Sequence, residues 1–179
     1  DQRTLVEESP KKSSGSNGVV ERAVQEVDGA LRAGYIALQE RLGRRLDARE
    51  RIVAFMPEYA AYLMNTLTKG EDGRVPYERV KGKSPSVLGL EFGEKLLYRK
   101  KVGKRLAKIK SRWGFGIFVG VKRRSNEIMV AVPSGVVYAR AVRRIDREKR
   151  WSEDSLNWVK WALWHRYKDD LEMDGLLPE

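Results

Sequence analysis

Apolar residues recur at every third or fourth position between residues 20 and 42, and this spacing constrains the fold more than any other feature. They are Val20, Val24, Val27, Leu31, Tyr35, Leu38 and Leu42. Steps of three and four place all seven side chains on one face of an α-helix. A helix of this kind gains most of its stability by packing that face against another element. The pattern therefore predicts a long helix that ends near Gly43 and has a packing partner.

A second helix is predicted in the segment that follows. Asp47 and Glu50 have the spacing of a capping box. Pro57 interrupts the pattern and is acceptable in the first turn of a new helix. An apolar face then continues as far as Leu67. Residues 71–91 are interpreted as a linker with one helical turn at 77–83, and residues 3–7 and 9–18 as a short strand and a loop.

The second half of the chain predicts short strands. Four segments are rich in Val, Ile and aromatic residues: Glu94–Arg99, Phe115–Val121, Glu127–Val132 and Val136–Val142. Turn residues separate the middle segments, and closely spaced short strands are typical of a small β-barrel. Alternation favours Phe115 and Phe118 as barrel core, whereas Trp113 could either stack on a base or cap the barrel.

A further helix is predicted at Ser152–Asp170. It carries Trp158, Trp161 and Trp164 at helical spacing. Such a stripe is more often core than a surface that stacks on bases or binds a partner helix.

Composition excludes several classes of protein. The chain has 179 residues, no cysteine and one histidine, His165, so disulfides and zinc sites built from Cys and His are excluded. No apolar run has the length of a transmembrane helix, and no membrane partner is expected. The formal net charge of +11 indicates a polyanionic partner.

Positive charge is concentrated in residues 95–124, which contain twelve Lys or Arg and no Asp or Glu. Cations that neutralise phosphates release counterions, so such a surface is typical of salt-dependent nucleic-acid binding. Two other interpretations are a solvated face that keeps the protein soluble and a surface for anionic membranes. The membrane interpretation is disfavoured because the basic residues lie mostly in predicted loops and strands rather than on an amphipathic helix.

A polar, glycine-containing loop precedes the first helix. Asn17 is a suitable N-cap, and Glu21 lies in the first turn. Glutamate is common there because it interacts favourably with the helix dipole. Glu21 could also reach a metal or a phosphate, and Lys11 and Lys12 lie just upstream.

Four segments in sequence order resemble the integrases of copia-type LTR retrotransposons, within the retroviral integrase superfamily. Ser16–Arg22 (SNGVVER) resembles the loop and helix that carry the third carboxylate of a DDE triad. Residues 59–65 and 75–83 resemble the following helix and the segment after it. Residues 91–95 and 113–120 resemble the strands that come next.

The resemblance implies an α+β fold: the helical end of a truncated RNase H-like integrase core, followed by a small SH3-like β-barrel and a C-terminal helix. The expected parts are a core fragment at 1–70, a linker at 71–91, a basic barrel at 92–150 and a tail at 151–179. It also implies Mg²⁺-dependent strand transfer in the full-length protein, with Glu21 as a catalytic residue and metal ligand.

The same resemblance and the basic clusters predict a non-specific DNA-binding surface. Its candidate residues are Lys11, Lys12, Asn17, Lys100, Lys101, Lys104, Arg105, Arg112, Arg123, Arg124, Arg143 and Arg144. The expected partners are DNA, both element ends and target duplex, and other integrase protomers. The expected location is the nucleus, with a cytoplasmic stage during particle assembly.

The family's first two catalytic aspartates have no counterparts in this chain. We therefore expect the chain to be a C-terminal piece of a polyprotein and to be inactive by itself, because one glutamate does not hold two metal ions. The alternative is a stand-alone or domesticated nucleic-acid-binding module without catalysis.

Overall fold

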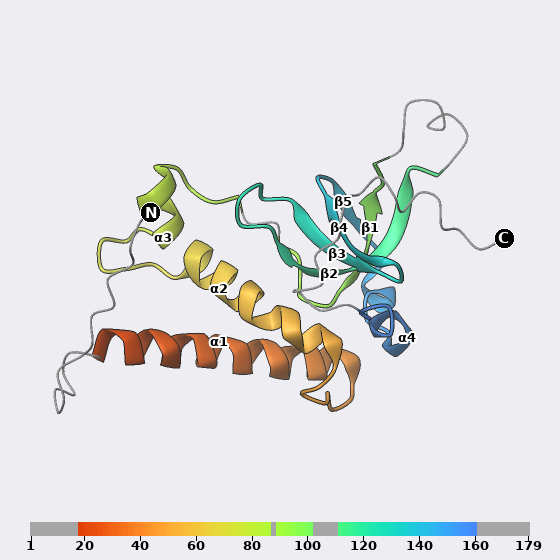
Figure 1. Ribbon diagram of the computed structural model, residues 1–179, viewed down its shortest axis with the longest axis horizontal. Coiled ribbons are helices and arrows are strands. Elements are labelled where there is room, and N and C mark those ends of the chain that lie inside the picture. The colour runs from red at the N-terminus through yellow and green to blue at the C-terminus, as the bar shows by residue number, and fades with distance from the viewer. Residues whose placement is uncertain (1–17, 87–88, 102–110, 161–179) are drawn as a thin grey trace, which may run out of the picture.

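The computed structural model describes residues 18–86, 89–101 and 111–160, and within them the chain folds as α+β, with helices followed by one antiparallel sheet (Figure 1). The helical part comprises α1 (Gly18–Leu42), the 3₁₀ helix η1 (Arg51–Phe55), α2 (Met56–Leu67) and α3 (Pro76–Lys81). The strands are β1 (Lys95–Arg99), β2 (Trp113–Val121), β3 (Ile128–Val132), β4 (Gly135–Ala139) and β5 (Val142–Arg144), and η2 (Arg147–Lys149) and α4 (Glu153–Leu156) follow them. The α+β class predicted from the sequence is confirmed.

Helix α1 confirms the helix predicted from the apolar spacing. Gly43 follows it with φ of +66°, the left-handed conformation in which glycine commonly ends a helix. Helix α2 runs back beside α1 (Figure 1), and Leu38 of α1 is buried in the same cluster as Phe55 and Met56. The apolar face of α1 therefore finds its partner in the helix predicted to follow it.

The capping-box segment forms only half of the predicted box. The amide of Asp47 donates to Glu50 Oε1 at 2.9 Å, but Asp47 Oδ1 accepts from the amide of Arg49 at 2.8 Å instead of that of Glu50. The segment is thus a tight turn that continues into η1 rather than into an α-helix. Pro57 then lies in the first turn of α2, as predicted.

The sheet has the strand order β4-β3-β2-β1-β5, and all neighbours are antiparallel. Only Arg140 and Ala141 separate its two edge strands, β4 and β5. This link spans at most about 11 Å, whereas the edges of a flat five-stranded sheet lie about 19 Å apart. The sheet must therefore curl. The single strand predicted at Val136–Val142 is wrong because the chain turns this corner between two strands on opposite edges.

The helices and the sheet share a hydrophobic core. On one face of the sheet, side chains of β2 and β3 pack with α1, η1, α2 and the α4 segment. We call this group the covered patch: Ile117, Val119, Met129 and Ala131. Gly93 lies at the same junction, with φ of +81°, and a Cβ atom there would lie 2.7 Å from Leu38 Cδ1. Helix α1 therefore packs directly against the backbone that leads into β1.

The opposite face of the sheet holds a second cluster that includes Leu96, Phe118 and Val130. Tyr59 of α2 reaches this cluster, with its ring edge-on to Phe118 at a centroid distance of 5.5 Å, and its hydroxyl donates to the carbonyl of Leu90 at 3.1 Å. Burial raises the pKa of Tyr59 to about 12. Both faces of the sheet are therefore closed by apolar packing over part of their area.

The helix predicted at Ser152–Asp170 is wrong at residues 157–160, because α4 ends at Leu156. Leu156, Trp158 and Val159 all pack on one cluster. A continuing α-helix would point Leu156 and Trp158 in nearly opposite directions. Trp158 is core-packed, in keeping with the favoured interpretation, whereas Trp161, Trp164, His165 and the strand predicted at 3–7 lie outside the described residues.

Candidate nucleic-acid interface

On the same face of the sheet as the covered patch, one part is covered by none of the helices that the structure describes. Lys95 pairs with Ile117, Leu97 with both Phe115 and Arg143, and Arg99 with Trp113, so these side chains share a face. We call the uncovered group the open patch: Lys95, Leu97, Arg99, Trp113, Phe115 and Arg143. None of its members is acidic.

Phe115 is the most unusual member of the open patch because 51% of its surface is exposed, while Phe118 is 1% exposed. The core position predicted for Phe118 is confirmed, and the one predicted for Phe115 is wrong. Alternation places Phe115 on the same face as Ile117, which is fully buried. Phe115 is exposed because the helices cover the sheet only as far as Ile117.

Cations lie over the aromatic rings of the open patch. Lys95 Nζ is 5.1 Å from the centroid of the Phe115 ring and 5.0 Å from that of Trp158. The guanidinium carbon of Arg143 is 4.4 Å from the Trp113 centroid. These are cation–π distances, so the patch presents charges and flat rings together.

The predicted residues Lys100, Lys101 and Arg112 lie at the adjoining ends of β1 and β2. All three are exposed. The amide of Lys100 donates to the carbonyl of Arg112 at 2.9 Å, which places these two residues opposite one another. They extend the positive surface beyond the open patch.

The turn between β2 and β3 carries Arg123 and Arg124, and both are exposed. A hydrogen bond from Ser125, together with the charges of Lys101 and Arg140, lowers the pKa of the neighbouring Glu127. The Nε atom of Arg140 lies 3.4 Å from Glu127 Oε1, and the amide of Arg99 donates to the carbonyl of Ala141 at 2.9 Å, so the corner after β4 brings the end of β1 towards this turn. Tertiary structure thereby gathers predicted cations that lie more than twenty positions apart in the sequence.

Arg144, another predicted DNA-binding residue, binds acidic side chains within the fold. Its Nη2 and Nε atoms lie 2.7 and 3.0 Å from Glu94 Oε2, and Glu94 is completely buried. Nη2 also lies 3.1 Å from Glu91 Oε1, while Arg41 of α1 lies 2.9 Å from Glu91 Oε2. The hydrogen bond to Glu94 raises the pKa of Arg144. We call these four residues the Arg144 network, and it ties α1 to β5.

Glu21 is exposed in the first turn of α1. The helical rise places it about 25 Å along the axis from Leu38, where α1 meets the sheet. The described residues contain no group of three or more His, Cys, Asp or Glu that could hold a metal ion. These residues therefore do not fit a Mg²⁺ site, and Glu21 is not brought to the open patch. The remaining predicted residues, Lys11, Lys12, Asn17, Lys104 and Arg105, lie outside the described residues.

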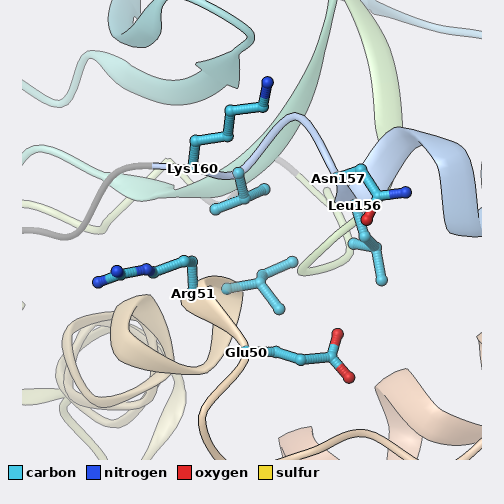
Figure 2. A pocket seen from close by; sticks show the side chains of 7 residues that line it. Glu50, Arg51, Leu156, Asn157 and Lys160 are labelled. Carbon is cyan, nitrogen blue, oxygen red and sulfur yellow. The ribbon is translucent and has the colours of Figure 1, made fainter.

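A surface hollow of about 330 Å³ lies between η1 and the α4 segment. Figure 2 shows the charged ends of Glu50, Arg51 and Lys160 pointing in different directions around it. Arg44 already holds the Glu50 carboxylate, through contacts of 2.7 and 3.0 Å. Because the described charged side chains that line it do not converge, the hollow is a weaker candidate than the open patch.

Comparisons of the chain with protein-family models, curated proteins and solved structures found no match. Within residues 18–86, 89–101 and 111–160, no helix has the length and apolar character needed to cross a membrane.

The sequence prediction did not include Lys95 or Phe115 among the site residues. The sequence nevertheless contained part of the information needed to find this surface. Trp113 and Phe115 are two positions apart on one strand, and Lys95 and Arg99 are four positions apart on another, so each pair lies on one face of its strand. The missing information was which part of the face the helices would leave uncovered.

Proposed function

We propose that this chain binds DNA through the cations of the open patch, Lys95, Arg99 and Arg143, and through the neighbouring Lys100, Lys101, Arg112, Arg123 and Arg124. The observation that carries the proposal is a curled sheet on which exposed cations gather around the open patch, whose six residues include no acidic side chain. Phosphate contacts from such a surface position a duplex without reading its sequence.

We further propose that the sheet is an SH3-like barrel of the kind found at the C-terminal end of integrases. The supporting feature is that β5 pairs with β1 after a two-residue corner. This pairing nearly closes the five short antiparallel strands into a barrel. In this proposal α1 and α2 are the helical end of an RNase H-like core. The chain then acts as the DNA-binding part of a retrotransposon integrase.

Under the same proposal Glu21 is the third carboxylate of the integrase triad. The other ligands of any Mg²⁺ ions would have to come from outside the described residues. Glu21→Gln should therefore leave DNA affinity unchanged, because Glu21 is distant from the proposed DNA-binding surface.

The proposed function is tested by fluorescence anisotropy of a labelled 20-base-pair duplex at several salt concentrations. Affinity should fall steeply as salt rises, with a log–log slope of about −0.9 for each neutralised phosphate. The triple variant R112A/R123A/R124A should weaken binding at low salt and flatten the slope by about 2 to 3.

The matched control, R22A/R32A/R45A, removes three exposed cations that belong to α1 and the turn after it and not to the sheet. It should keep the wild-type slope. The proposal fails if affinity is insensitive to salt, or if the two triple variants lose affinity equally, since that would indicate a response to net charge alone.

A further inference from the structure

The exposed ring of Phe115 is not explained by duplex binding. Cations are sufficient to contact the phosphates on the outside of a duplex, where the faces of the bases are stacked and inaccessible. A half-exposed phenylalanine beside Lys95 adds nothing to such contacts. An exposed aromatic ring contributes to binding where it can stack on a planar group of the partner, such as an unpaired base.

Trp113 and Phe115 together form a platform with two rings. They lie two positions apart on β2 and point to the same face, so their Cα atoms are separated by about 6.7 Å. Each ring has a cation beside it, Lys95 or Arg143. Exposed cation–π pairs are weak, so each cation can move from its ring to a phosphate when a base takes its place.

We propose that Trp113 and Phe115 stack on unpaired bases, so that the open patch binds single-stranded DNA or the unpaired end of a duplex. Lys95 and Arg143 then contact the phosphates of the stacked nucleotides. Stacking of this kind tolerates any base, because every base has a π face. The proposal rests on the proposed function and adds to it the form of DNA that this surface prefers.

The test compares three labelled probes in the same salt: a 12-nucleotide single strand, an abasic strand of equal length and phosphate number, and the corresponding duplex. Wild-type protein should bind the intact strand about tenfold more tightly than the abasic strand. Phe115→Ala should clearly reduce that difference, because only the Trp113 ring then remains, and should leave duplex affinity nearly unchanged. Phe115→Trp should preserve it, because the ring is retained.

Leu67→Ala is the matched control, because Leu67 is 53% exposed and lies at the end of α2 rather than on the sheet. It should bind all three probes like the wild type. Equal binding of the intact and abasic strands by the wild type would overturn the stacking proposal while leaving the proposed function intact. Equal loss of duplex and single-strand affinity in Phe115→Ala would also overturn it. Absence of binding to every probe would instead refute the proposed function.

Discussion

Phe115 and Ile117 lie two residues apart on the same face of the same strand, yet one is 51% exposed and the other is fully buried. Ile117 packs beneath the helices together with Leu38 and Phe55. Phe115 lies beyond the edge of that cover, with Lys95 over its ring. Strand alternation thus decides which face a side chain occupies, and the covering elements decide whether that face is core or binding surface.

The largest expected effect comes from truncating the covered member of this pair. Ile117→Ala removes three buried heavy atoms and should lower the free energy of unfolding by about 3 to 4 kcal/mol. Phe115→Ala should lower it by less than about 1 kcal/mol, because its ring is already half in water. Urea denaturation followed by circular dichroism measures both values. Similar losses in the two variants would contradict the division between covered and open patches.

Arg143 and Arg144 are neighbours on β5 that point to opposite faces of the sheet. Arg143 belongs to the open patch, whereas Arg144 binds the buried Glu94. Arg144→Ala leaves the buried Glu94 carboxylate unpaired and should cost about 3 kcal/mol, the lower end for a broken buried pair because Arg144 is partly exposed. Arg143→Ala should cost less than about 1 kcal/mol and should instead weaken DNA binding. Denaturation and duplex titration of the two variants separate these roles.

The control for Arg144 is the double variant E94L/R144L. Replacing both members of a buried pair with apolar residues is often close to neutral, so the double variant should recover most of the stability lost in Arg144→Ala. If the double variant were as unstable as the single one, the loss would come from packing of the arginine stem and not from an unpaired charge.

The smallest expected effect concerns the ion pair between Arg44 and Glu50, in the turn that leads into η1. Hydrogen bonding from Arg44 lowers the pKa of Glu50 below its usual value of about 4.5. Because the pKa of Glu50 is lower in the folded state than in the unfolded state, the pair stabilises the fold at pH values above the unfolded-state pKa. This stabilisation is lost as the pH falls through the folded-state pKa. The advantage of the wild type over Glu50→Gln should therefore be less than about 1 kcal/mol near neutrality and should shrink below about pH 4.5. An advantage that grew on acidification would contradict this assignment.

Local patterns predicted most of the elements, but not their junctions. The apolar spacing of α1 and the turn residues around β3 act over a few positions, and both predictions were confirmed. The corner at Arg140 and Ala141 was missed because no pattern in the neighbouring sequence indicates that β5 pairs with β1, a strand more than forty positions earlier. The early end of α4 was missed for a similar reason, since contacts with the core outweigh the helical pattern of its tryptophans.

The candidate interface shows the same division. The concentration of Lys and Arg was visible in the sequence, and Arg123 and Arg124 are exposed in a turn. Arg144 looked equivalent to Arg143 because the chain contains no local sign that Glu94 would be buried beside it.

The sequence by itself determined the α+β class, the long amphipathic helix and the positive charge of the second half, because helical period, strand alternation and net charge are properties of short segments. Only the tertiary structure decided that Arg144 would bind Glu94 and that Phe115 would stay in water. The physical reason is that burial depends on where distant elements stop covering one another, and α1, η1 and α2 cover β2 at Ile117 but not at Phe115.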